Sequence, residues 1–123
     1  MNTLLSLDCQ LNSELMTTVR LATGGICSYA GLDIDVAEDC KVCVTESLLL
    51  LMHGGYPQAR VSFYEDGGVR VQIEAMGNKQ GSIEVPDDGI SSALLFALAN
   101  DVNMKKEKDC LKAIEFRFVT NGR

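Results

Sequence analysis

The stretch that decides the fold spans residues 58–75 and reads QARVSFYEDGGVRVQIEA. Apolar and polar residues alternate on both sides of Asp66-Gly67-Gly68, a turn sequence that tolerates positive φ. The apolar positions are Ala59, Val61 and Phe63 before the turn and Val69, Val71, Ile73 and Ala75 after it. This pattern predicts a β-hairpin with one buried face.

A long helix is expected before the hairpin, over residues 35–53, with Gly54-Gly55 at its end. Asp35, followed three residues later by Glu38, is an acidic form of the capping box. Apolar residues recur at spacings of three and four; they are Val36, Cys40, Cys43, Val44, Ser47, Leu48 and Leu51. Leu49, Leu50 and Met52 widen this stripe, so we expect the second half of the helix to be buried.

Another helix is expected over residues 14–29, capped by Asn12 or Ser13. Its predicted inner face repeats at the same spacings and consists of Leu15, Val19, Ala22, Ile26 and Tyr29. Gly24 and Gly25 weaken the helix by about 1 kcal/mol each relative to Ala. They also leave room for a neighbouring element.

Strands are expected at both ends of the chain, over residues 3–9 and 113–119. Residues 76–88 are predicted to form a loop. A helix capped by Ser91 or Ser92 is expected to run through Asn103, and residues 105–109 to turn the chain. The residues predicted to face inward from this helix are Leu94, Leu95, Leu98 and Val102.

The predicted order is β-α-α-β-β-α-β within one domain over residues 1–123. It indicates an α+β fold, a two-layer sandwich of a mixed, mainly antiparallel sheet with the helices on one face.

The bulk composition narrows the function classes. Formal charge is −6, which disfavours binding to a phosphate backbone, so no nucleic-acid partner is expected. Five cysteines, an odd number without regular spacing, favour free thiols in a reducing compartment. The longest apolar run, residues 48–52, is far shorter than the roughly 20 residues of a membrane span. With no signal-peptide pattern at the N-terminus, we expect a soluble, cytoplasmic protein.

Several segments resemble the histidine-kinase-like ATPase (GHKL) fold in its anti-sigma-factor serine-kinase branch. LDIDVAEDCKVCVTESL, residues 32–48, looks like the family helix that carries the N-box. VRVQIEAMGNKQG, residues 69–81, looks like the strand that leads into the Asp-x-Gly-x-Gly box. SSALLFALANDVNM and AIEFRFV resemble the last helix and strand, so the resemblance covers nearly the whole chain.

The resemblance also implies where a nucleotide would bind. Glu46 matches the general base of the family, and Asp39 and Lys41 resemble residues upstream of it. Leu50 stands where an Asn should hold magnesium, and Ala75 where an Asp should bind the adenine amino group. Gly77 matches the first Gly of its box.

The remaining motif positions depart from the family as well. Lys79 replaces the second Gly of the box, and residues 89–93, beginning with Gly89, replace the phosphate loop. The resemblance therefore implies a pseudo-enzyme without a cofactor. Its expected role is a regulatory protein-binding module that resembles an anti-sigma factor. The alternative is a weak ATP-binding anti-sigma-factor serine/threonine-protein kinase, which would use ATP and magnesium.

The expected partners are a sigma factor or an anti-sigma-factor antagonist, together with a second copy in a homodimer. The family resemblance supports the homodimer, as do the glycines of the first helix and a first strand, residues 3–9, that has the features of a sheet edge.

Other features have simpler interpretations. Glu46 can be an ordinary helix carboxylate. Cys40 and Cys43 form a C-x-x-C that could be redox-active, but its place on the apolar face of a helix favours core packing. His53 is expected to cap the end of its helix rather than to act as a base or a pH switch. Residues 76–81 lack the Gly-Lys-Ser/Thr of a phosphate loop and favour a surface loop.

Overall fold

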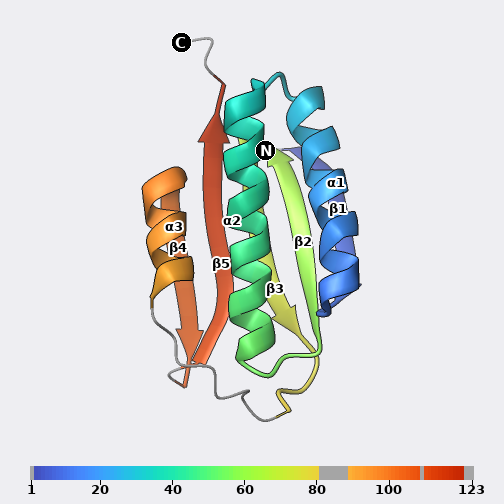
Figure 1. Ribbon diagram of the computed structural model, residues 1–123, viewed down its shortest axis with the longest axis vertical. Helices are drawn as coiled ribbons and strands as arrows, with labels where there is room; N and C mark the ends of the chain where they lie inside the picture. The colour runs from blue at the N-terminus through green and yellow to red at the C-terminus, as the bar shows by residue number, and fades with distance from the viewer. Residues whose placement is uncertain (1, 81–88, 109, 121–123) are drawn as a thin grey trace.

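The computed structural model describes residues 2–80, 89–108 and 110–120. Within these residues, eight elements follow one another in the order β-α-α-β-β-α-β-β (Figure 1). They are β1 (Asn2–Gln10), α1 (Ser13–Tyr29), α2 (Ile34–His53), β2 (Gln58–Glu65), β3 (Gly68–Met76), α3 (Ile90–Leu98), β4 (Asn100–Glu107) and β5 (Cys110–Val119).

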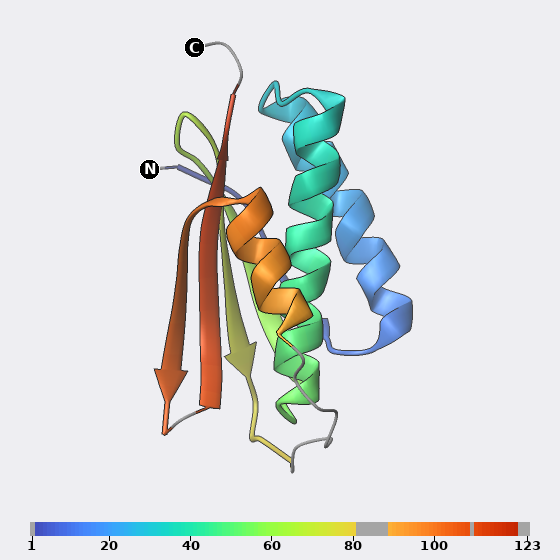
Figure 2. The same cartoon turned by 60° about the vertical axis from the view of Figure 1, so that its left-hand side comes forward.

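The five strands form one sheet in the order β1-β2-β3-β5-β4. Every neighbouring pair is antiparallel, so the sheet is not mixed within the described residues. All three helices cover the same face of the sheet, which Figure 2 shows from the side. α2 lies in the middle, with α1 on one side and α3 on the other. The predicted α+β fold, two layers with helices on one face, is confirmed at this level.

The predicted hairpin is confirmed as β2 and β3. Ala59 pairs with Ala75 and Phe63 with Val71, so the alternating apolar residues of the two strands share one buried face. Gly68 is required for a reason beyond the turn. A Cβ at this position would collide with the carbonyl oxygen of Phe118, because β5 passes close by.

The long helix is confirmed, but its cap is different. Asp33, not Asp35, precedes the first turn, and its Oδ1 accepts a 2.9 Å hydrogen bond from the Val36 N–H. Glu38 instead pairs with Lys41 at 3.0 Å. The expected apolar stripe is the buried face; its fully buried members are Cys40, Cys43, Val44, Ser47, Leu48 and Leu51.

In α1 the predicted inner face is right only in part: Val19 is buried as expected, but the buried face is shifted by part of a turn. The buried residues are Met16, Val19, Thr23 and Cys27, while Tyr29 is 73% exposed. Thr23 can be buried because its hydroxyl donates to the Val19 carbonyl at 2.8 Å, which satisfies the polar group inside the helix. Asn12 is confirmed as the cap, since its Oδ1 accepts from the Leu15 N–H at 2.9 Å.

The third helix is shorter than predicted, and a strand was missed. α3 ends at Leu98, and residues 100–107, expected to be helix and then turn, form β4. Ala99 is extended, with φ −104° and ψ 161°, and Asp101 has a positive φ of 53°. Val102 therefore lies in a strand and not on the helix face.

The other face of the sheet carries polar side chains, and none of the described helices covers it. Arg60 binds Asp8 through two hydrogen bonds, of 2.6 and 3.0 Å. Arg70 lies between Asp66 and Glu115, at 2.9 and 2.6 Å. No described helix is both long enough and apolar enough to cross a membrane.

Candidate functional site

The positions that the resemblance assigns to a nucleotide site lie on three elements. Glu46 and Leu50 are one turn apart in the C-terminal half of α2. Ala75 is the penultimate residue of β3, and Gly77 follows that strand. Gly89 precedes α3. Figure 1 shows the end of α2, the end of β3 and the start of α3 at the same, lower end of the molecule.

Glu46 is engaged by a side chain of α3. The Ser91 hydroxyl donates a hydrogen bond of 3.1 Å to Glu46 Oε1, and both residues are half-buried. This bond joins the first turn of α3 to α2, the element against which α3 packs. The carboxylate is thus used in a contact between helices.

Leu50 and Ala75 belong to the hydrophobic core. Leu50 is half-buried and packs against the core cluster. Ala75 is only 2% exposed and faces Ala59 across the β2–β3 ladder. Both side chains are hydrocarbons that exclude water, and neither carries an atom that can ligate a hard cation or accept a hydrogen bond.

The segment after β3 is held against other parts of the chain. Gly77 has φ +83°, and a Cβ there would lie 2.7 Å from Cγ of Pro57. The Gln80 N–H donates to the Gly55 carbonyl at 2.8 Å. The Lys79 ammonium lies 2.8 Å from the Cys110 sulfur and is exposed. The other part of the predicted loop, residues 81–88, lies outside the described residues.

The start of α3 differs from its prediction. Gly89, with φ +78°, occupies the cap position, and neither Ser91 nor Ser92 does. A positive φ favours glycine, which explains the residue type without a phosphate. Ser91 lies inside the first turn, where its hydroxyl is directed at Glu46. Sequence reasoning missed this contact, because a Ser near a helix start is also the signature of a cap.

The C-x-x-C pair lies in the core, as predicted. Cys40 and Cys43 are both 0% exposed. A hydrogen bond with the Cys27 thiol of α1, together with burial, raises the pKa of Cys40 well above its usual value. Burial, assisted by the charges of Asp39 and Glu46, raises the pKa of Cys43 to about 12. The part played by Cys27 was not predicted, because nothing in the sequence pairs residues of two different helices.

Among residues 2–80, 89–108 and 110–120, no group of three or more His, Cys, Asp or Glu side chains is arranged to hold a metal ion.

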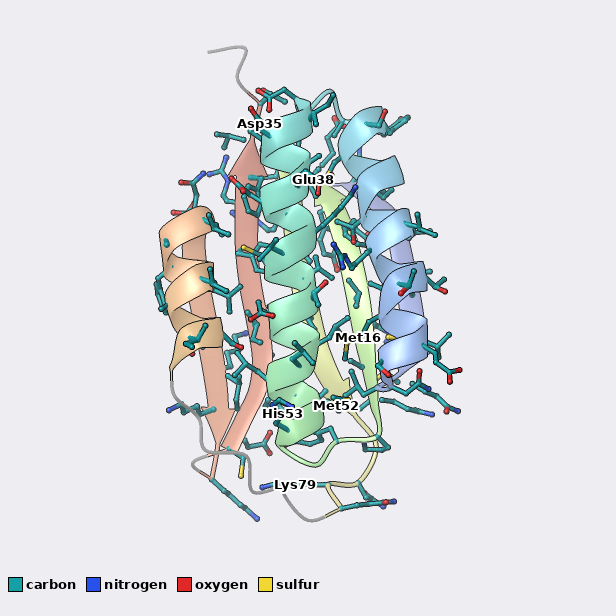
Figure 3. The ribbon with its side chains drawn as sticks, in the orientation of Figure 1. Met16, Asp35, Glu38, Met52, His53 and Lys79 are labelled. Carbon is teal, nitrogen blue, oxygen red and sulfur yellow. The ribbon has the colours of Figure 1, made fainter. Side chains whose placement is uncertain are left out.

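His53 is the last residue of α2, and Figure 3 shows it at the lower end of that helix near Met52. The carbonyls of the last turn accept hydrogen bonds from the backbone N–H groups of Gly54, Gly55 and Tyr56, with N–O distances of 3.0–3.3 Å. The backbone beyond the helix therefore performs the capping that was predicted for the imidazole.

Comparisons with known proteins leave the family open, since neither the models of known protein families nor the curated proteins include a match to this chain.

Proposed function

We propose that this chain is a regulatory protein-binding domain with a histidine-kinase-like ATPase fold, similar to anti-sigma factors, that neither binds nor hydrolyses ATP. The observation that supports this most is the Ser91–Glu46 hydrogen bond of 3.1 Å. It engages the one carboxylate that the resemblance makes catalytic, and it lies in a contact between α2 and α3.

The residues present do not fit ATP and magnesium. A magnesium site needs oxygen ligands, and an adenine amino group needs an acceptor. Leu50 and Ala75 supply hydrocarbon at these two positions, and both contribute to the core. Losing one charge-assisted hydrogen bond costs about 1.5–3 kcal/mol. Two lost contacts would turn a micromolar affinity into one of about 0.2 mM or weaker.

A regulator of this kind can act without nucleotide, because its partner contacts use other surfaces. The proposed partners are a sigma factor or an antagonist of anti-sigma factors, bound by a homodimer. β1 is an edge of the sheet, as expected, and an edge strand exposes backbone groups that another strand can bind. We place the proposed dimer contact at this edge.

Calorimetry of the purified chain with ATP and magnesium at millimolar concentration tests the proposal. We expect no saturable heat, while an ATP-binding protein in the same buffer gives a normal isotherm. A dissociation constant of about 100 μM or tighter would contradict the pseudo-enzyme proposal. Binding to a sigma factor, measured by size-exclusion chromatography with light scattering, should be the same with and without ATP.

A weak anti-sigma-factor serine/threonine-protein kinase is the second candidate, and the carboxylate of Glu46 is the feature in its favour. One variant distinguishes the two candidate functions. Glu46→Gln should leave partner binding unchanged for a protein-binding domain, whereas a kinase would lose phosphate transfer from labelled ATP to the antagonist.

A further inference from the structure

A lysine and a cysteine from two distant segments meet at the lower end of the molecule. Lys79 lies in the segment that follows β3, and Cys110 is the first residue of β5. The Lys79 ammonium donates a hydrogen bond of 2.8 Å to the Cys110 sulfur, although the two residues are 31 positions apart. Figure 3 shows Lys79 below the end of α2. We call these two residues the Lys79–Cys110 pair.

The backbone beside each member of the pair is hydrogen-bonded to another part of the chain. Gln80, next to Lys79, donates its N–H to the Gly55 carbonyl at 2.8 Å. Cys110 pairs with Glu107 in the ladder between β4 and β5. Because the fold holds the backbone on both sides of the contact, the amine and the thiol stay within reach of each other.

The charge beside Cys110 is opposite to the charge beside Cys9, the other half-buried cysteine. Burial, together with the negative charge of Asp8, raises the pKa of Cys9. Cys110 instead receives an ammonium, and this hydrogen bond raises the pKa of Lys79 above its usual value. The thiolate is the form of cysteine that reacts with peroxides, and an adjacent ammonium stabilises a thiolate. The pair therefore combines a nucleophilic sulfur with a proton donor in contact with it.

We propose that hydrogen peroxide converts the contact between Lys79 and Cys110 into a covalent nitrogen–sulfur bond. In the first step the Cys110 thiolate attacks one peroxide oxygen, and the O–O bond breaks. The leaving hydroxide takes a proton from the Lys79 ammonium, which gives a sulfenic acid, water and a neutral amine. In the second step the amine nitrogen attacks the sulfur, the S–O bond breaks and a second water leaves. The sulfur loses two electrons, and the peroxide gains them.

The position of Lys79 favours this bond over a disulfide. A sulfenic acid also condenses with a second thiol. The thiols of α1 and α2 are fully buried in the core, and Cys9 lies on β1, which β2 and β3 separate from β5. The Lys79 amine, in contrast, is already in contact with the sulfur.

A thiol would reopen the nitrogen–sulfur bond. Its attack on the Cys110 sulfur releases the Lys79 amine and leaves a mixed disulfide, which a second thiol molecule reduces. The Lys79–Cys110 pair is thus a reversible modification site. This inference is independent of the proposed function, since it needs neither a protein partner nor a nucleotide.

Mass spectrometry of the reduced chain after treatment with equimolar hydrogen peroxide tests the proposal. We expect the intact chain to lose two hydrogens, and a digest to give one cross-linked pair of peptides that contain Lys79 and Cys110. Dithiothreitol should restore the original mass. Dimedone, which traps sulfenic acids, should replace the cross-link by an adduct on Cys110 when it is present during the reaction, with less adduct on Cys9.

Two substitutions separate the charge of Lys79 from its amine. Lys79→Arg keeps a positive charge, but a guanidinium keeps its protons and cannot attack the sulfur. This variant should form the dimedone adduct at about the unmodified rate and give no cross-link. Lys79→Gln removes both properties, so it should give no cross-link and form the adduct about 3-fold more slowly, which is the effect of one exposed charge pair.

Lys112→Gln is the matched control. Lys112 lies two residues from Cys110 on the same strand, but its ammonium lies over the ring of Tyr56, at 5.1 Å from the ring centre. This variant should form the cross-link as the unmodified protein does. Circular dichroism checks that all variants are folded.

Three results would overturn the proposal. The first is a Cys110 that gains oxygen without becoming linked to Lys79. The second is a cross-link that persists in Lys79→Gln or disappears in Lys112→Gln. The third is faster formation of the dimedone adduct on Cys9 than on Cys110, which would show that the Lys79 ammonium does not activate the sulfur.

Discussion

Ser91 Oγ donates a hydrogen bond to Glu46 Oε1 at 3.1 Å, across the interface between α3 and α2. Ser91 stands at a helix start where a hydroxyl would often cap the backbone, and Gly89 has taken the cap position instead. The hydroxyl is thereby available to the carboxylate. A position that resembles a catalytic base thus has a structural use in this chain.

Ser91→Ala should lower the free energy of unfolding by about 1 kcal/mol, the net value of one partly buried hydrogen bond. The midpoint of thermal unfolding should fall by about 4 °C. Ser92→Ala is the matched control, because it removes the same group from the same helical turn.

A double-mutant cycle with Glu46→Ala measures the coupling between the two side chains. It should return a coupling energy of about 0.5–1.5 kcal/mol. A coupling indistinguishable from zero would show that the contact contributes no stability.

Ala75→Asp introduces the residue that the resemblance assigns to this position. It should destabilise the domain by more than about 3 kcal/mol, because it buries an unpaired carboxylate in the core. Ala93→Asp is the control, since Ala93 is exposed in the first turn of α3. We expect the free energy of unfolding of this variant to lie within about 0.5 kcal/mol of that of the unmodified protein. Urea unfolding measures both. A well-folded Ala75→Asp protein that binds ATP would show that the position can still serve a nucleotide.

The buried thiols should react slowly. In native protein at pH 8, Cys40 and Cys43 should be alkylated much more slowly than in urea-unfolded protein, because burial and a raised pKa withhold the thiolate. Cys9 and Cys110, which are half-buried, should react first. Peptide mass spectrometry after timed exposure to iodoacetamide gives the order. Rapid modification of both core thiols, or a disulfide between them in mild oxidant, would refute the assignment.

The Cys43 thiol should also make the stability of the domain depend on pH in the alkaline range. The pKa of Cys43 is about 12 in the folded chain and 9.0 for an ordinary thiol. Between these two pH values the Cys43 thiol has lost its proton in the unfolded state and kept it in the folded state. The free energy of unfolding therefore falls as pH rises from about 9 to 12. Urea unfolding across this range should show the loss, and Cys43→Ala should show a shallower slope. An identical slope in Cys43→Ala would show that other groups cause the loss of stability.

Strong local patterns were enough to predict much of the fold. The β2–β3 hairpin combines strict alternation with a turn sequence, and the buried face of α2 repeats without interruption, so both were predictable. α1 was ambiguous, because a face through Leu15 and one through Met16 both satisfy helical spacing. The packing of α1 decides between them and buries Thr23, whose hydroxyl bonds the Val19 carbonyl of its own helix.

β4 could not be predicted from periodicity, because Leu94, Leu98 and Val102 continue a helical spacing into the strand. For the site, the resemblance gave the positions but not their contacts. The Ser91–Glu46 and Cys27–Cys40 pairs each join residues of two different helices, and only the packing of α2 against its neighbours brings them together.

The last prediction concerns the edge strand β1. Ser6 is at the centre of Asn2–Gln10, so in a symmetric antiparallel pairing of two β1 strands each Ser6 would face its own copy. Ser6→Lys would then place two like charges opposite each other and should dissociate the dimer. Leu5→Lys would be a less informative change, because Leu5 packs against the core and its loss would also affect folding. Ser6→Ala is the control, since it removes the same 3.0 Å contact with Ser62 without adding charge.

Light scattering of the unmodified protein and Ser6→Ala should give a dimer, and that of Ser6→Lys a folded monomer. A monomer at tens of micromolar for the unmodified protein would remove the basis of the dimer proposal, and a dimer that persists in Ser6→Lys would place the contact on another surface.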